Sequence, residues 1–309
     1  MSKKLSTLRA LPKIIVIVGP TASGKTALSI KVARKFNGEI ISADSRQIYR
    51  GFNIGTAKPT KAEMKKVKHY LIDIKNPNEE YTVAQYKKDA VAAIRKILKN
   101  GKIPILVGGT GLYIKAVVDN LEIPKVKPNP KLRQKLEREL RKKGLKYLYE
   151  KLIKLDPEAA YIIDRNNPRR VIRALEITLQ SEIPFSKQRR RGPQLFNALK
   201  IGLNSQKEIL KYRIDKRADQ MVKNGLVDEV KNLIKKYSPD LPAFDAIGYR
   251  EIINYLEDKI SLNEAITLIK RNTWRYAKRQ ITWFKKDKEI KWIRNDNQAL
   301  NLAKNFLKN

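Results

Sequence analysis

The sequence contains no cysteine and a single histidine, His69. Without cysteine the chain has no disulfide framework, no thiol nucleophile and no thiolate-bound zinc, and one histidine excludes a histidine metal cluster. Acidic residues are also scarce. The sequence has 31 Asp and Glu and 67 Lys and Arg, which gives a formal net charge of +36. The simpler explanation of this excess is a lysine-rich composition that serves solubility. A charge of this size nevertheless attracts polyanions, of which nucleic acid is the most common.

Long uncharged apolar segments are absent too. No run reaches the length that a membrane span needs without charges, and residues 1–10 lack the apolar core of a signal peptide. We therefore expect a cytoplasmic protein with no membrane partner. We also expect the protein to be a monomer. The 309 residues are enough for one large domain or two.

One motif carries most of the information. The pattern G-x-x-x-x-G-K-[ST] is matched by Gly19, Pro20, Thr21, Ala22, Ser23, Gly24, Lys25 and Thr26. An apolar run at 14–18 predicts a buried strand before it, and residues 27–34 predict a helix after it. In this context backbone N–H groups and the helix N-terminus bind a di- or triphosphate, Lys25 adds a positive charge, and Thr26 can ligate Mg²⁺. The motif alone specifies neither what carries the phosphate nor that a phosphoryl group moves.

The order of elements predicts the fold class. Further strands are expected at 39–44, 103–107, 197–203 and 291–293, with a helix at 82–99. Strands that alternate with helices behind a P-loop predict an α/β fold, a P-loop NTPase-like core with a mainly parallel sheet flanked by helices. Ligands of such sheets bind beyond the carboxyl ends of the strands. The P-loop, Asp44 and Thr110 should therefore share one edge.

No segment between 124 and 192 has a pattern typical of a strand. Prolines at 124, 128 and 130 precede leucines at helical spacing there. This predicts an all-helical insertion domain at 124–192 within a core domain of 1–123 and 193–309.

Two helices carry basic residues on one side and apolar residues on the other. In the insertion, Arg169, Arg170 and Arg173 lie opposite Val171, Ile172, Leu175 and Leu179. Near the end of the chain, Arg271, Arg275, Lys278 and Arg279 lie opposite Ile266, Trp274, Ile281 and Phe284. Each basic side is either a solvated face or a surface for RNA phosphates. We expect the first helix to be anchored by its apolar side and to present three guanidinium groups.

Six motifs in order resemble the tRNA dimethylallyltransferase (tRNA isopentenyltransferase) family of bacterial or organellar type. They are GPTASGKT at 19–26, ADSRQIYRGFNIGTAKP at 43–59, LVGGTGLYIKA at 106–116, NNPRRVIRALE at 166–176, AIGYREI at 246–252 and YAKRQITWF at 276–284. The resemblance covers nearly the whole chain. It implies transfer of a dimethylallyl group from dimethylallyl diphosphate, with Mg²⁺. The implied acceptor is N6 of the adenine 3′ of the anticodon, in tRNAs that read codons beginning with U.

The resemblance also implies residue roles. Lys25 and Arg217 would neutralise the departing diphosphate, and Asp44 would be the general base, although a carboxylate at this position can instead support magnesium. Contacts with the tRNA anticodon stem-loop are implied for Asp44, Ser45, Arg46, Gln47, Thr110, Arg169, Arg170, Val171, Ile172, Arg173, Asp245, Gly248, Tyr249 and Arg250. The pair at 245–246, Asp-Ala, departs from the basic or bulkier pair of many members, which puts base contacts from that loop in doubt.

Three other functions compete with this interpretation. An adenylate isopentenyltransferase would use the same core on a free nucleotide, and the helical insertion and basic stripes argue against it. A small-molecule P-loop kinase would not need the Asp-Ser-Arg-Gln motif at 44–47, and no arginine-rich lid is evident. A tRNA-binding protein without enzymatic activity would not need the P-loop.

Overall fold

The protein is described by a computed structural model that covers residues 11–124, 126–188 and 190–309. Residues 1–10 of the expected core domain, and positions 125 and 189 of the expected insertion, lie outside the described residues. The chain divides into two compact units. One holds the chain up to Val118 together with Gln194–Asn309, and the other holds Asp119–Pro193.

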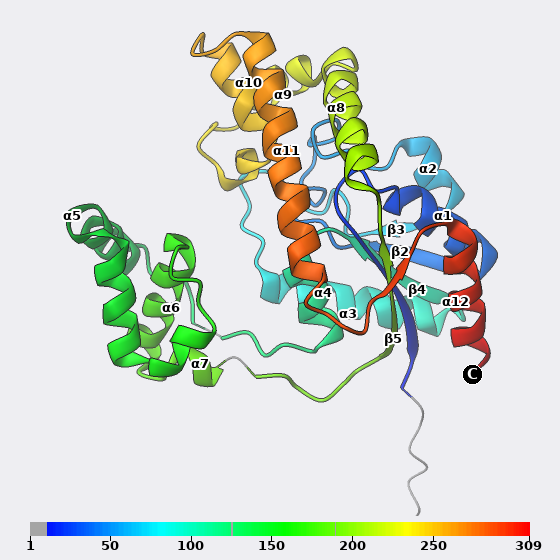
Figure 1. The fold of residues 1–309 in the computed structure, drawn as a ribbon, viewed down its shortest axis with the longest axis horizontal. Coiled ribbons are helices and arrows are strands. Elements are labelled where there is room, and N and C mark those ends of the chain that lie inside the picture. The colour runs from blue at the N-terminus through cyan, green and yellow to red at the C-terminus, as the bar shows by residue number, and fades with distance from the viewer. Residues whose placement is uncertain (1–10, 125, 189) are drawn as a thin grey trace, which may run out of the picture. The chain divides into compact units, whose positions relative to one another are not determined.

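A six-stranded sheet forms the centre of the first unit (Figure 1). Its order is β3-β2-β4-β1-β5-β6, and every neighbouring pair is parallel. The strands are β1 Lys13–Val18, β2 Gly38–Ser42, β3 His69–Tyr70, β4 Ile103–Gly108, β5 Asn197–Leu203 and β6 Lys291–Ile293. The predicted parallel α/β sheet is thereby confirmed.

The sequence of β1 explains why it lies in the middle of the sheet. Its side chains alternate between the two faces, so Ile14 and Val16 join one apolar core while Ile15 and Ile17 join another. Helices α3 (Val83–Lys99) and α4 (Gly111–Val118) cover the first face. Helices α1 (Lys25–Lys35) and α12 (Asp296–Lys308) cover the second, as Figure 1 shows. A strand buried on both faces needs the continuous apolar run that this segment has.

Four further helices of this unit pack around a separate apolar core. They are α8 Lys207–Lys223, α9 Leu226–Ile234, α10 Tyr249–Leu256 and α11 Leu262–Phe284, with a 3₁₀ turn at Pro242–Asp245. Helix α2, Lys61–Lys66, has no buried residue. Phe52 lies in the loop after β2 and packs against Tyr249 and Phe244. The centroid of its ring is 4.4 Å from the ring centroid of Tyr249 and 5.1 Å from that of Phe244. The carboxylate of Glu229 accepts hydrogen bonds from the backbone N–H groups at 53–55. These contacts hold the long loop 45–59 in one conformation.

The second unit is helical. It contains α5 (Pro130–Leu155), which is interrupted at Gly144 with φ +80°, then a 3₁₀ turn Pro157–Tyr161, α6 (Pro168–Ser181) and α7 (Phe185–Gln188). Among its described residues no strand occurs, and its core joins leucines of α5 to the apolar side of α6. The helices expected from the leucine spacing are therefore present.

Helix α6 differs from its prediction at two positions. Leu179 is 39% exposed, so it is not part of the apolar anchor. Arg173 does not present a free guanidinium, because it donates to Oε2 of Glu176 at 2.6 Å and to the carbonyl of Val126 at 2.8 Å. The reason is Glu176 itself, a fully buried carboxylate that requires cationic partners. Arg169 and Arg170 are exposed, as predicted.

Within the described ranges, no helix combines the length and the hydropathy that a membrane span requires.

Candidate active site

The loop between β1 and α1 has the backbone that the motif predicts. Three of its residues adopt positive φ: Gly19 at +152°, Ala22 at +61° and Gly24, the N-cap of α1, at +94°. Left-handed residues in such a loop turn successive N–H groups toward one side, next to the N-terminus of a helix. The hydroxyl of Ser23 is buried and has no hydrogen-bond partner among the described residues. The loop can therefore bind an oxyanion with both backbone and side-chain donors.

Lys25 is the electrostatic centre of this loop. Its ammonium group donates to the carbonyl oxygens of Gly19 at 2.9 Å and Pro20 at 2.6 Å. Burial lowers its pKa to about 7, the negative charge of Asp44 opposes this change, and the positive charge of Arg217 adds to it. Burial also lowers the pKa of Arg217. The three residues predicted to be catalytic thus lie close enough for their charges to interact.

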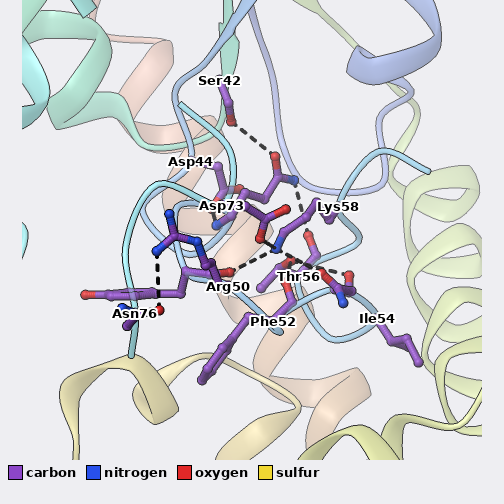
Figure 2. Close-up of polar contacts among 12 residues, drawn as sticks. Ser42, Asp44, Arg50, Phe52, Ile54, Thr56, Lys58, Asp73 and Asn76 are labelled. Atoms are coloured by element: carbon purple, nitrogen blue, oxygen red, sulfur yellow. Dashed lines mark hydrogen bonds and ion pairs between the residues drawn. The ribbon is translucent and has the colours of Figure 1, made fainter. Parts of the chain in front are cut away.

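Asp44 follows β2 and is held by its own backbone turn. Its Oδ1 accepts hydrogen bonds from the N–H groups of Arg46 at 2.8 Å and Gln47 at 3.4 Å. In the part of the chain that the structure describes, Oδ2 makes no hydrogen bond, so it remains available to a substrate. The amide of Gln47 is engaged by the loop, since it accepts from Ser42 and donates to the carbonyls of Thr56 and Ala57 (Figure 2).

Thr110 connects the loop after β4 to the residues around Asp44. Its Oγ1 accepts a hydrogen bond from the N–H of Ser45 at 3.1 Å, and its own N–H donates to the carbonyl of Ala43 at 3.1 Å. The side chain of Tyr276, on α11, also hydrogen-bonds to Thr110, and burial together with Asp44 raises the pKa of that phenol to about 12. Tyr276 therefore stays neutral and is a hydrogen-bonding group on the same side of the site as Asp44.

Gln280 was not predicted as a site residue, although it lies at the junction of two site loops. Its Oε1 accepts a hydrogen bond from the N–H of Thr21 at 2.8 Å, and its Nε2 donates to the carbonyl of Gly109 at 3.0 Å. A Cβ at position 109 would collide with that amide, so a side chain there would displace Gln280 from its hydrogen bonds. The available signal was a glutamine among the apolar residues of α11, where a polar side chain needs hydrogen-bond partners.

A cavity of about 960 Å³ adjoins the loop 19–26 at Ala22. Its cationic lining consists of Arg50, Lys58, Lys61, Arg213, Lys216 and Arg217. Lys58 is almost fully buried and donates to Asp73, to the side chain of Asn53 and to the carbonyl of Tyr49 (Figure 2). Cationic walls beside a phosphate loop favour the approach of a polyanionic ligand.

Several residues predicted to contact RNA have side chains that the protein already engages. Arg46 donates to the carbonyls of Pro242 and Ala243. The side chain of Tyr249 is fully buried and donates to Glu229 at 2.7 Å, so only its backbone could contact RNA. Val171 and Ile172 are likewise buried in the second unit. Asp245 and Arg250 form an ion pair at 3.0 Å, and Gly248, with φ +99°, is the N-cap of α10. These contact roles remain predictions.

The model of the IPP transferase family matches residues 47–287 of the chain. A tRNA dimethylallyltransferase from Acetivibrio thermocellus is 48% identical over 280 residues, which cover 89% of this chain and 90% of that protein. One from Thermoanaerobacter sp. is 50% identical over 279 residues, which cover 88% of this chain and 89% of that protein.

The chain belongs to the IPP transferase family.

Solved structures agree with this assignment. The crystal structure of a tRNA isopentenylpyrophosphate transferase from Bacillus halodurans is 41% identical, with a TM-score of 0.71, and the match covers 96% of this chain and 98% of that one. A eukaryotic dimethylallyltransferase acting on tRNA is 29% identical, with a TM-score of 0.81 over 96% of this chain and 80% of the other. The predicted resemblance and the fold class of the IPP transferase family are both confirmed.

Proposed function

We propose that this protein transfers a dimethylallyl group from dimethylallyl diphosphate to tRNA. The proposed acceptor atom is N6 of the adenine 3′ of the anticodon, in tRNAs that read codons beginning with U. The relatives above are named for this class of reaction, so a prenyltransferase that modifies tRNA is the function that family membership supports.

The observation that carries the proposal is the electrostatic proximity of Lys25, Asp44 and Arg217. The loop 19–26 and its lysine, with Arg217, provide positive groups for a diphosphate. Asp44, whose Oδ2 has no hydrogen bond within the described chain, provides a proton acceptor beside them. A site that joins a leaving-group anion pocket to a carboxylate fits transfer of a carbon group to an amine.

In the proposed step, N6 of adenine forms a bond to C1 of the dimethylallyl group while the bond from C1 to the diphosphate oxygen breaks. The electron pair of that bond leaves with the diphosphate, where Lys25 and Arg217 stabilise the developing charge. N6 loses one proton, which Asp44 accepts at Oδ2. Thr110 and Tyr276 lie on the side of Asp44, where they can orient the adenine, and extrusion costs least from an unpaired loop.

Magnesium fits the residues of this site. Among the described residues, no group of three or more histidine or acidic side chains is arranged so that it could hold a metal ion, so an all-protein cage is not available there. Mg²⁺ commonly takes one or two protein oxygens together with substrate phosphates and water. The Thr26 hydroxyl, in the first turn of α1, and the nearby Asp44 could supply those oxygens, and the buried Ser23 hydroxyl adds a polar group. The ion would neutralise charge on the diphosphate. Asp44 then serves either as the base or as support for the metal.

The alternatives receive less support. An adenylate isopentenyltransferase would act on a free nucleotide, whereas the relatives named above are tRNA enzymes that match nearly the whole chain, the helical unit included. A small-molecule kinase does not explain why tRNA enzymes match nearly the whole chain, and a tRNA-binding protein without activity does not explain the phosphate loop. We also propose that the enzyme is cytoplasmic and monomeric, and sedimentation of the purified protein would test the oligomeric state.

The proposal is tested by acceptor choice. The full-length protein is incubated with Mg²⁺ and labelled dimethylallyl diphosphate, and separately with tRNA, AMP or ADP. Label should enter tRNA alone, and nuclease digestion should place it on the adenosine 3′ of the anticodon. Label in AMP or ADP would support the free-nucleotide alternative, and a requirement for ATP hydrolysis would contradict direct prenyl transfer.

A further inference from the structure

Tyr113, in the first turn of α4, is buried at 6% exposure, yet its hydroxyl has no hydrogen-bond partner among the described residues. Two side-chain atoms of the described chain are fully enclosed without a partner, on Ser23 and His69, and this hydroxyl is not one of them, so a ligand can reach it. We infer that the Tyr113 hydroxyl donates a hydrogen bond to a ring nitrogen of the acceptor adenine. The inference rests on the proposed function, because that adenine is the acceptor named there.

Contacts on two sides hold Tyr113 in place. Its ring stacks on that of Tyr86 from α3, with 3.8 Å between the centroids and 15° between the planes. Tyr86 is fully buried, and its own hydroxyl donates to the carbonyl of Ser42 at 3.1 Å, two residues before Asp44. The backbone N–H of Tyr113 donates to the carbonyl of Thr110 at 3.0 Å. Tyr113 is therefore fixed relative to Asp44 and Thr110, the residues that we place beside the acceptor.

The charges that act on the hydroxyl place it near Asp44. Burial and the neighbouring Tyr49 raise the pKa of the Tyr113 phenol, the positive charge of Arg46 lowers it, and the negative charge of Asp44 raises it. The net effect is an increase, so the phenol stays neutral at physiological pH and keeps its proton as a hydrogen-bond donor. Within the described chain, none of these three neighbours accepts a hydrogen bond from Tyr113. The donor is therefore left for a ligand.

The chemistry of adenine indicates which atom this hydroxyl meets. In the proposed step N6 approaches Oδ2 of Asp44, and the ring nitrogens N1 and N7 flank this amine on its two sides. Both are hydrogen-bond acceptors, and enzymes that extrude a base read its edge by such bonds. Tyr276 and Thr110 already bond to each other, whereas the Tyr113 hydroxyl is unpaired within the described chain. A hydrogen bond to N1 or N7 would keep N6 aligned with the prenyl carbon.

The experiment removes the hydroxyl and the ring nitrogens in turn. Tyr113→Phe keeps the ring that stacks on Tyr86, and three synthetic anticodon stem-loop RNAs carry adenosine, 1-deazaadenosine or 7-deazaadenosine at the target position. With adenosine, the variant should transfer the labelled dimethylallyl group about three- to tenfold more slowly in single turnover. With one of the two deaza RNAs, the variant and the wild type should react at equal rates, because the acceptor nitrogen is already absent. The other deaza RNA should retain the full difference.

Tyr81→Phe is the matched control, since the hydroxyl of Tyr81 donates to Asp89 at 2.8 Å. Loss of that hydrogen bond should lower the midpoint of urea unfolding, while the rates with all three RNAs stay near those of the wild type. Tyr113→Phe should do the opposite, because it removes no hydrogen bond of the described chain. Its urea midpoint should equal or exceed that of the wild type, whereas a purely structural role of Tyr113 requires a lower one.

Two kinds of failure are distinguishable. If Tyr113→Phe is as fast as the wild type with adenosine, or slows all three RNAs by the same factor, the inference is wrong and the proposed function stands. If the wild type transfers no label to the adenosine RNA, the proposed function is wrong. The contact is then tested by fluorescence anisotropy with the same RNAs, where the affinities should follow the same pattern. Equal affinities of the two proteins for the adenosine RNA would overturn it.

Discussion

The amide of Gln280 donates a hydrogen bond to the carbonyl of Gly109 across 3.0 Å, between residues 171 positions apart in the sequence. The same side chain accepts a hydrogen bond from the N–H of Thr21. One buried glutamine therefore joins the loop that would hold the diphosphate to the loop that carries Thr110. Because a transferred group must be aligned with its acceptor, the spacing of these two loops matters for the rate of the reaction.

We predict that Gln280→Met lowers turnover at least tenfold while the dissociation constants for pyrophosphate and RNA change only a few-fold. The substitution leaves the N–H of Thr21 and the carbonyl of Gly109 without partners, which should also cost about 1–3 kcal/mol of stability. Gln280→Glu retains the acceptor toward Thr21 and loses the donor toward Gly109, so it should be impaired as well. Single-turnover rates and urea unfolding measure the two effects.

A control separates positioning from general destabilisation. Ile269→Val truncates a buried side chain on the same helix, away from both loops, at a cost of about 0.5–1.5 kcal/mol. It should leave the single-turnover rate near that of the wild type. If it slows the reaction as much as Gln280→Met does, Gln280 has only a structural role.

Asp44 gives the second prediction. Asp44→Asn preserves an oxygen for the N–H of Arg46 but removes the proton acceptor, so turnover should fall by about a hundredfold to ten-thousandfold. RNA affinity should stay within a few-fold of the wild type. Asp240→Asn, at an exposed carboxylate, is the matched control and should have normal kinetics. Near-normal turnover of Asp44→Asn would rule out the assignment of Asp44 as general base.

Lys25 should take up protons when a diphosphate binds. With a pKa of about 7, it is half-protonated at neutral pH, and a bound polyanion holds it fully protonated. At pH 7 the wild type should therefore bind about half a proton more with pyrophosphate than Lys25→Met does. Affinity should weaken above pH 7 in the wild type more steeply than in the variant. Calorimetry in buffers of different ionisation enthalpy measures the difference, and equal proton uptake by both proteins would disprove the perturbed lysine.

The same lysine should reduce the stability of the ligand-free protein. Its pKa is about 7 when folded against an ordinary value of 10.5, so between these pH values the unfolded chain binds more protons. The contribution of Lys25 to stability therefore rises with pH across that window. Lys25→Met should stabilise the protein at pH 7 by about 1–3 kcal/mol and lose this advantage toward pH 10. Urea unfolding at both pH values tests this, with Lys31→Met, an exposed lysine of the same helix, as the control.

The parts of this molecule that could be predicted are those in which the local sequence and the tertiary contacts favour the same backbone conformation. The apolar run of β1 and the glycines at 19 and 24 each specify a local conformation, so the sheet and the phosphate loop could be predicted. The hydrogen bonds of Gln280 could not, because both partners are distant backbone groups. The prediction that Arg173 presents a free guanidinium was wrong for the same reason. Helical periodicity placed Arg173 on the basic side of α6 but did not indicate that Glu176 is buried nearby.

Substitution of the arginines of α6 should have two different effects, one on RNA binding and one on stability. Arg169→Ala/Arg170→Ala changes exposed side chains, so stability should be unaffected, whereas stem-loop RNA binding should weaken and its salt slope should fall by about 0.7 to 0.9 per lost phosphate contact. Arg173→Ala removes one of two cations from buried Glu176 and should cost about 1–3 kcal/mol in urea unfolding of the full chain.

Pyrophosphate binding should be unchanged in both variants, since its proposed site is in the first unit. An Arg169/Arg170 variant with wild-type affinity and slope would show that this side of α6 is only solvated. The helical unit would then have to contact tRNA through another surface.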